Sequence, residues 1–467
     1  MYSDHLTSAP NWCHHEFANV ELKDARLENR CKALAVALST QPSLPINQAC
    51  EDWTDTKAAY RFFANEKITH ERILQPHQQR TIKRMSLHSL VLAVQDTSFL
   101  NYTHHPRKQG MGEIGNKQQN QQGIVMHSTL ALTSEGMPLG VLDQQIWARP
   151  VGEPGKTPAQ CRQQPIEEKE SYKWLQAFQK TINLSPDNTK VLTICDREAD
   201  IYEMFALAEE ENVHLLVRAN FDRVLMDESE HKLWAKVKKA PVAGSVLVHI
   251  PKSDTQPKRD AILSVRYTSV TLKPPWRPNK KKLPVITLQA VLAQEENPPD
   301  GVEKPIEWLL LTNCLVGSFE DAVQIIKWYR CRWQIEVFHK VLKSGCAIEQ
   351  CRLETAERLL PFIALKSVIA WRLHWITYIN RHEPNKPCTI ILATHEWEAL
   401  YMRIHRTSTL PAEPPTVREA VRWIGQLGGF LGRKGDGEPG VTAIWRGWHR
   451  LQDFATTWYL VKEQTYG

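Results

Sequence analysis

Two short apolar runs, each followed at once by an aspartate, constrain the fold of this chain more than any other feature. The first is Ser89–Gln95 (SLVLAVQ), followed by Asp96, and the second is Lys190–Cys195 (KVLTIC), followed by Asp196. Such runs are typical of buried strands in an α/β sheet, and catalytic groups gather where these strands end. Either aspartate alone could instead be a helix cap or a turn residue, because aspartate is favoured after strands.

The segments around these runs predict the rest of a sheet. A hairpin is expected between them, with its turn near Ser134–Gly136, followed by a helix over residues 166–182. After Asp196 come a helical segment (ADIYEMFALAEEE), a strand (HLLVRAN), a β-rich insertion and a further helix. This is the element order of the ribonuclease-H-like fold, in which the first and fourth strands are neighbours. The predicted class is therefore α/β, with Asp96 and Asp196 brought together.

The segment Ser318–Gly345 is predicted to be that further helix, in one piece. Ser318 can serve as the N-cap, with Asp321 three residues later, and Gly345 can end the helix in a left-handed turn.

One face of this predicted helix carries cations around a single carboxylate. At about 100° per residue, five side chains share a narrow stripe: Tyr329, Arg332, Glu336, Lys340 and Lys343. From Tyr329 to Lys343 the stripe is about 21 Å long, which suits a nucleic-acid backbone better than a small-molecule pocket. The alternative interpretation is a solvated helix face with ion pairs four residues apart.

Asp96, Asp196 and Glu336 together predict a metal site. Three carboxylates suit Mg²⁺, which prefers oxygen ligands and leaves positions open for phosphate and water, and Mn²⁺ is expected to substitute for it. Two such ions can activate the attacking oxygen and stabilise the leaving oxygen of an in-line phosphoryl displacement. The combination of strand-end aspartates with the helix stripe favours this interpretation over three separate structural roles.

Several motifs resemble those of the insertion-sequence-four family of bacterial DDE transposases. Cys195–Asp200 (CDREAD), followed by IYE, resembles the family signature around the second aspartate, and Val94–Tyr102 (VQDTSFLNY) resembles the first-aspartate segment. The residue types and spacing of the helix stripe match the family's Tyr-Arg-Glu-Lys signature. The resemblance spans nearly the whole chain.

The resemblance implies a role for each matched position. Asp96, Asp196 and Glu336 would be the catalytic, metal-binding triad. Tyr329, Arg332 and Lys343 would hold phosphates beside the scissile bond, and Arg218 would support catalysis. Lys340 is a further candidate DNA contact because it lies on the same stripe.

Two tryptophans are implied to lie near a base that is flipped out while a DNA hairpin forms. Trp308 would be the stacking platform, and Trp333 would be a second aromatic close to the same base. Stacking of a base on an aromatic ring contributes roughly 1–3 kcal/mol, so an extruded base needs such a platform. The alternative for Trp308 is an ordinary core position, because WLLL is a buried-strand pattern.

The insertion before Glu336 carries a basic loop. The chain has a net charge of +6, which permits nucleic-acid binding without proving it. Between Lys252 and Lys282, nine lysines and arginines face only two aspartates. Lys280 and Lys281 are expected to contact DNA phosphates, with Trp276 as a stacking residue, unless the loop is simply solvated and flexible.

Four regions are predicted. Residues 1–74 form a helical domain for transposon-end DNA, residues 75–220 and 306–375 the catalytic core, residues 221–305 the β-rich insertion, and residues 376–467 a helical dimerisation domain. Arg26, Arg30 and Arg61 are candidate DNA contacts, although each could be an ordinary surface cation. The C-terminal helices could likewise do no more than pack on the core.

Cysteine usage and hydropathy bear on the compartment. The ten cysteines are scattered without a CxxC pair, as expected for reduced thiols of a cytoplasmic protein, which would be nucleoid-associated when active. No signal peptide and no apolar run of transmembrane length are expected.

These inferences predict a cut-and-paste transposase. It would act as a homodimer in a synaptic complex on double-stranded DNA, cutting at inverted-repeat ends and joining the 3′-OH ends to target DNA, with no membrane partner. A ribonuclease-H-like structure-specific nuclease or resolvase is the alternative enzyme. A DNA-binding protein without catalysis is disfavoured because the three carboxylates and their spacing are intact.

Overall fold

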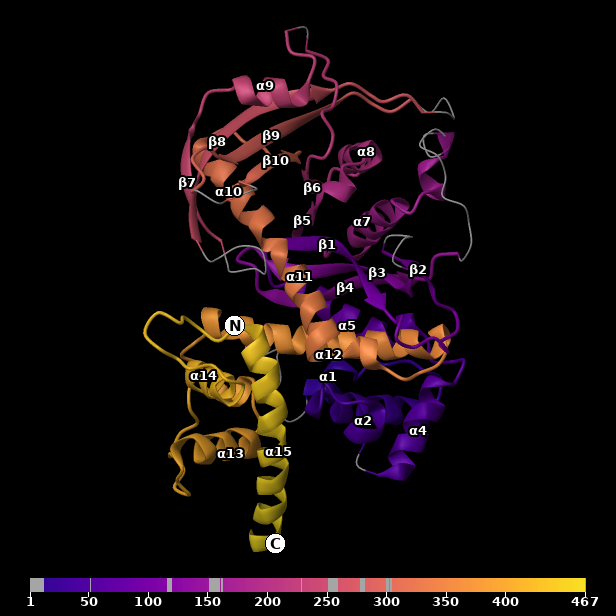
Figure 1. Cartoon of the computed structure of the whole chain (residues 1–467), viewed down its shortest axis with the longest axis vertical. Coiled ribbons are helices and arrows are strands. Elements are labelled where there is room, and N and C mark those ends of the chain that lie inside the picture. The colour runs from indigo at the N-terminus through magenta and orange to yellow at the C-terminus, as the bar shows by residue number, and fades with distance from the viewer. Residues whose placement is uncertain are drawn as a thin grey trace.

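The computed structural model describes the chain except for residues 1–11, 51, 116–119, 151–159, 161–162, 228, 251–258, 278–281, 300–301, 303–304 and 467 (Figure 1). The N-terminal helices are α1 (Trp12–Glu16), α2 (Ala25–Thr40), α3 (Ile46–Ala49), α4 (Trp53–Phe63) and α5 (His70–Met85). Polar side chains start the longer ones, since Asp24 caps α2, Asp52 caps α4 and Thr69 caps α5.

The centre of the molecule is a mixed β-sheet. Its strands are β1 (Leu90–Asn101), β2 (Gly112–Ile114), β3 (Gln121–Thr133), β4 (Pro138–Trp147), β5 (Lys190–Cys195), β6 (His214–Arg218), β7 (Gly244–Ile250), β8 (Arg259–Leu272), β9 (Ile286–Glu295) and β10 (Glu307–Thr312). In the described residues these strands form one sheet in the order β2-β3-β1-β5-β6-β10-β9-β8-β7, with β4 paired to β3. The strands of the insertion therefore extend the core sheet through β9 and β10.

The predicted neighbour relation of the first and fourth strands is confirmed. β1 pairs with β5 in parallel, with Val94 opposite Ile194. β3 and β4 form the predicted hairpin, and its turn contains Gly136 at φ 90°, a left-handed conformation that glycine adopts without strain.

The first strand is longer than predicted. Asp96 was expected at its end, but β1 continues to Asn101 because its second half pairs with β3, where Asp96 lies opposite Ser128. Only the pairing with β5 stops before Asp96. The aspartate therefore lies inside a strand whose one neighbour has ended, which fixes its backbone while leaving one side open.

Helices cover both faces of the sheet (Figure 1). α7 (Tyr172–Leu184), α8 (Tyr202–Glu210) and α9 (Leu233–Lys239) pack on one face around Trp174 and Phe205. α10 (Phe319–Cys331), α11 (Trp333–Lys340) and α12 (Ala356–His382) pack on the other. The helix predicted over residues 166–182 begins later, at Tyr172, because residues 166–168 form a separate 3₁₀ turn.

The segment Ser318–Gly345 is not one continuous helix. Its start is as predicted, with a capping box between Ser318 and Asp321. α10 ends at Cys331, α11 begins at Trp333, and the last turn, Val341–Gly345, is a π-helix. π-turns are frequent at functional sites.

Gly345 does not supply the predicted left-handed turn. The left-handed residue is Ala347, at φ 48°. A Cβ on Gly345 would lie 3.1 Å from the ring of Trp445, so the C-terminal helix approaches closely at this glycine.

The C-terminal helices are α13 (Thr394–His405), α14 (Val417–Leu427) and α15 (Val441–Tyr466), and they pack beside α12 (Figure 1). α14 and α15 cross without room for side chains. A Cβ on Gly428 would lie 1.9 Å from the Ala443 carbonyl oxygen, and one on Gly447 would lie 1.7 Å from that of Ile424.

The helix α12 runs through the middle of the molecule. By length and composition it could cross a membrane, contrary to the expectation that no apolar run is long enough. However, 94% of its most apolar window is buried inside the protein, and Lys366 within it donates to the Pro42 carbonyl oxygen at 2.7 Å. α12 is thus the shared core helix of the flanking parts.

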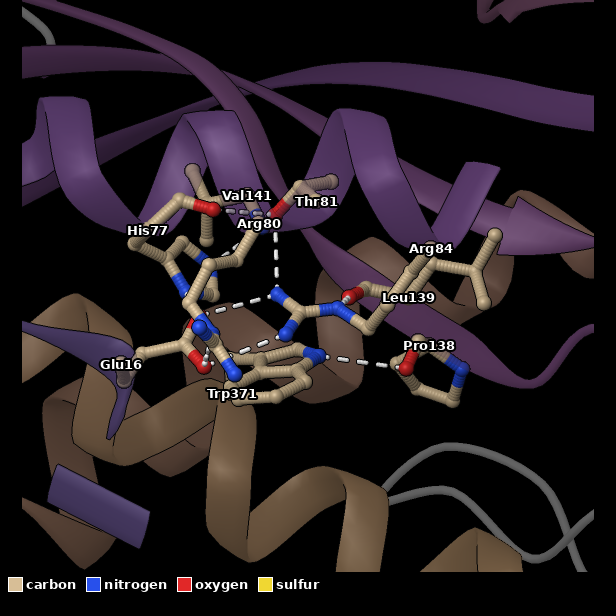
Figure 2. Close-up of polar contacts among 9 residues, drawn as sticks. All are labelled: Glu16, His77, Arg80, Thr81, Arg84, Pro138, Leu139, Val141 and Trp371. Carbon is tan, nitrogen blue, oxygen red and sulfur yellow. Dashed lines mark hydrogen bonds and ion pairs between the residues drawn. The ribbon is translucent and has the colours of Figure 1, made fainter. Parts of the chain in front are cut away.

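A buried polar network attaches the N-terminal helices to the core, and Figure 2 shows it. The Glu16 carboxylate of α1 accepts hydrogen bonds from both terminal nitrogens of Arg84, at 3.0 and 3.1 Å, and lies 3.5 Å from Arg80. His77 Nε2 accepts from the Val141 amide at 2.9 Å, so its Nδ1 carries the proton that it donates to Glu16 at 2.5 Å.

The same network extends to α12 and β4. The Arg84 guanidinium lies 4.4 Å from the ring centroid of Trp371, whose indole N–H donates to the Pro138 carbonyl oxygen at 3.1 Å. Arg84 Nε also donates to the Leu139 carbonyl oxygen. One carboxylate thus connects α1, α5, α12 and the sheet.

Candidate active site

The strand register places the predicted site residues in one row. Asp96 and Asp196 each lie two residues beyond the paired residues Val94 and Ile194. β5 pairs in parallel with β6, where Cys195 lies opposite Val217, so the next position aligns Asp196 with Arg218. Because side chains alternate along strands, these three point to the same face as Val94 and Ile194, which is the face covered by α10 and α11.

β10 brings Trp308 to the same edge. Arg218 pairs with Leu310, which lies two residues after Trp308 on β10. The Arg218 side chain also donates a hydrogen bond to the Glu307 carbonyl oxygen at 2.9 Å. The half-buried Trp308 ring meets Tyr329 of α10 edge-on, with 5.6 Å between ring centroids.

α11 presents Glu336 to this row of strands. Arg332, in the break between α10 and α11, donates to the Glu336 carboxylate at 2.6 Å. One turn beyond Glu336, the Nδ1 atom of His339 lies 3.6 Å from Asp96 Oδ2. The helix break and the sheet therefore place three carboxylates and two nitrogen-containing side chains around one space.

The pKa values of the three carboxylates are shifted by burial and by the neighbouring charges. Burial raises the pKa of Asp196, and the charge of Asp96 adds to the rise. Burial also raises the pKa of Glu336, with further contributions from both aspartates, although Arg332 opposes the shift. Asp96 is the exception, since the contact with His339 and the charge of Arg332 outweigh burial and lower its pKa.

These residues fit a divalent cation in donor type. All three are carboxylates, the ligands that hard cations prefer, and their mutual repulsion is relieved when a cation lies among them. As the side chains stand, no group of three or more His, Cys, Asp or Glu residues in the described part of the chain is arranged to hold a metal ion. At this site the Glu336 carboxylate accepts a hydrogen bond from Arg332.

Lysine and arginine side chains lie around the carboxylates and differ in how deeply they are buried. Burial lowers the pKa of Lys343, opposed by the nearby charges of Glu349 and Asp96. Burial alone would also lower the pKa of Arg332, but Tyr329 and Glu336 raise it above its ordinary value. Lys340 is exposed and Trp333 is half exposed, both outside this inner group.

Other predicted DNA contacts lie elsewhere. Arg26, Arg30 and Arg61 line a cleft between α2 and α4 that also holds the 75% exposed ring of Trp53. Arg30 there is bonded to Asp55 at 2.6 Å.

Lys280 and Lys281 lie outside the described residues. Near them, Trp276 is 76% exposed, and Arg277 pairs with Glu203 of α8 at 2.5 Å. The start of the basic loop is therefore held against the core by an ion pair.

His339 is the site residue that sequence reasoning missed. It lies three residues after Glu336 and hence on the same helix face, a signal that the stripe of cations obscured.

The fold and the site together define a class. A ribonuclease-H-like sheet with acids on adjacent strands and on a covering helix is the architecture of DDE nucleic-acid enzymes. Comparison with protein families specifies the kind: the transposase DNA-binding model matches residues 9–68, the transposase DDE domain model matches residues 173–372, and the transposase Tn5 dimerisation domain model matches residues 368–462. The chain therefore carries a transposase DNA-binding domain, a transposase DDE domain and a dimerisation domain of the Tn5 transposase type.

The DDE match contains Asp196 and Glu336 but begins after Asp96. The association of Asp96 with the other two acids thus rests on the β1–β5 register and on the shifted pKa values. DDE transposases generally use divalent metal ions.

Proposed function

We propose that this protein is a cut-and-paste DNA transposase, similar to the transposase of the kanamycin-resistance composite transposon. It binds inverted-repeat ends as a homodimer, cleaves both strands there and joins the 3′-OH ends to target DNA. One observation carries the proposal: Asp96 and Asp196 follow the paired strands β1 and β5 at equivalent positions, in a chain that matches transposase DNA-binding and dimerisation domains.

The site residues divide the work of phosphoryl transfer. Asp96, Asp196 and Glu336 would hold Mg²⁺, which when bound activates the attacking oxygen and stabilises the leaving oxygen. Arg332 and Lys343 supply positive charge next to the carboxylates, where the scissile phosphate must come. Water opens the first phosphodiester bond and frees a 3′-OH, which then attacks the opposite strand to close a hairpin; a second water reopens that hairpin.

The regions follow the same proposal. We assign residues 1–74 to end binding, residues 75–220 and 306–375 to catalysis, residues 221–305 to a DNA-contacting insertion and residues 376–467 to dimerisation. The protein would work in the bacterial cytoplasm, on the nucleoid.

The proposal predicts end-specific cleavage. With Mg²⁺, the protein is expected to nick DNA at the boundary of the inverted repeats that flank its gene, and Mn²⁺ is expected to replace Mg²⁺. The assay compares that DNA with the same DNA carrying scrambled repeats and with a four-way junction, on native and denaturing gels. Cleavage of the junction or of scrambled DNA as efficiently as of the repeats would favour the nuclease or resolvase instead.

The hairpin step predicts a defect on removing Trp308. The Trp308 ring lies on the strand row of the site, in edge contact with Tyr329, where it can support an extruded base. Trp308→Ala is expected to slow hairpin formation about 10- to 100-fold, the equivalent of roughly 1–3 kcal/mol of stacking, while the first nick continues. Trp308→Phe, which keeps a ring, is expected to retain most activity. Unchanged double-strand cleavage by Trp308→Ala, with no hairpin trapped, would contradict this step.

A further inference from the structure

His339 of α11 is buried beside Asp96 in the candidate active site. Its side chain is 6% exposed and packs beneath β1 and β3, with Nδ1 3.6 Å from Asp96 Oδ2. Its other ring nitrogen, Nε2, is buried and has no hydrogen-bond partner among the residues that the structure describes. Asp96 thus has a neighbour that is anchored by packing and has a single polar contact in the site.

Burying a histidine with an unpaired ring nitrogen lowers the stability of the folded protein, which suggests that the residue has another role. A buried polar atom without a partner costs about 1–3 kcal/mol, so an apolar residue would stabilise this helix–sheet contact better. The polar group recorded nearest to the ring is the Asp96 carboxylate on β1, at an ion-pair distance of 3.6 Å that is longer than a hydrogen bond. Packing fixes the ring, and the ring in turn restricts the carboxylate.

We propose that His339 is a positioning residue that holds Asp96 through Nδ1 and thereby sets the affinity of the site for its divalent cation. This inference rests on the proposed metal-dependent function. A side chain that orients a ligating carboxylate typically changes metal affinity by 10- to 100-fold when it is removed.

His127 on β3 is a matched control. It is as buried as His339, and in the described part of the chain its Nε2 also has no hydrogen-bond partner, but it packs on Trp174 of α7, on the opposite face of the sheet. Its Nδ1, however, is 2.9 Å from the hydroxyl of Thr97, not from a carboxylate. The two histidines share burial and differ in their partner.

The geometry also predicts which replacement restores the function. An asparagine amide places its N–H₂ donor near the position of histidine Nδ1, whereas glutamine places it near Nε2. His339→Asn is therefore expected to bind metal nearly as the wild type does, and His339→Gln and His339→Leu are not.

The test measures Mn²⁺ binding to the full-length protein by electron paramagnetic resonance, without DNA and without catalysis. His339→Leu is expected to raise the Kd for Mn²⁺ 10- to 100-fold, His339→Asn to return it to within about threefold of wild type, and His127→Leu to leave it unchanged. Melting temperatures recorded alongside separate folding from binding.

The competing account is that His339 only fills space. It would be supported, and the proposal overturned, if His339→Leu bound Mn²⁺ as the wild type does, or if His127→Leu weakened binding equally. A different outcome would refute the proposed transposase function alone. In it, the variants bind Mn²⁺ with the expected differences in affinity, but the wild type does not cleave DNA at the transposon ends, and the role of His339 is retained.

Discussion

Replacing Asp196 by alanine or asparagine is expected to abolish strand cleavage while binding of end DNA persists. Asp196 lies where β5 ends, beside Asp96, and burial together with that neighbour raises its pKa. Its carboxylate also accepts a hydrogen bond from the Glu198 amide at 2.9 Å and so caps the turn that follows β5. Asparagine keeps an oxygen for this bond, so Asp196→Asn separates the loss of charge from the loss of the cap. We expect nicking to fall by on the order of 10³-fold or more, as when a group on which the reacting centre depends is lost.

Glu198 provides the control for this experiment. It lies two residues from Asp196, is 66% exposed on its side chain and contacts Lys173 at 3.6 Å. Glu198→Ala changes the local charge by the same amount but should leave nicking close to wild type. The measurement is a time course of nicking with Mg²⁺, alongside a gel-shift assay of end binding. Nicking by Asp196→Ala at the wild-type rate would remove this residue from the active site.

The sequence predicts the part of the site that follows from local pattern. Apolar runs ending in Asp96 and Asp196 identify buried strands, and strand order then makes the acids neighbours. The helix stripe identifies Glu336 because side-chain periodicity is a local property. Both signals depend on residues close together in the chain, and this is why they can be read without a structure.

What the sequence does not show depends on contacts between distant segments. The break at Arg332 and the π-turn before Cys346 arise where α10 and α11 fit against the sheet and α15, so the predicted single helix was wrong. The extension of β1 depends on pairing with β3. His339 acquires its partner only through the fold, because Asp96 lies more than two hundred residues earlier.

The Glu16 network is a clearer example of contacts between distant segments that the sequence does not show. Glu16 and Arg84 are ordinary charged residues by pattern, and sequence alone would place them on the surface. In the fold the Glu16 side chain is 6% exposed and that of Arg84 is 9% exposed. Because the pair is buried, replacing one of its partners should strongly lower the free energy of unfolding.

Glu16→Ala is expected to destabilise the protein by about 3–5 kcal/mol, because it leaves the buried Arg84 and the partly buried Arg80 without their counterion. Glu21→Ala, at an exposed position of the same domain, should change stability by less than about 0.5 kcal/mol. The measurement is urea unfolding followed by circular dichroism.

Lowering the pH should remove the same stabilisation, because it protonates Glu16. Burial by itself would raise the pKa of Glu16, but the charge of Arg84 and the contact with His77 outweigh it and hold the pKa well below the ordinary 4.5. A carboxyl group whose pKa is lower in the folded state stabilises above its unfolded pKa, and this contribution declines as pH falls below about 4.5. The difference in unfolding free energy between wild type and Glu16→Ala is therefore expected to be constant near neutrality and to shrink below that pH.

A double variant tests whether the loss comes from an uncompensated charge. Glu16→Leu combined with Arg84→Met removes both partners, and it should be more stable than Glu16→Leu alone, because no buried guanidinium is left without its counterion. Since Arg84 also contacts Trp371 of α12, the single variant should weaken the whole molecule in one transition. Limited proteolysis distinguishes this from local release: selective cutting near residue 68, with a stable remaining core, would show that the N-terminal helices are attached independently of Glu16.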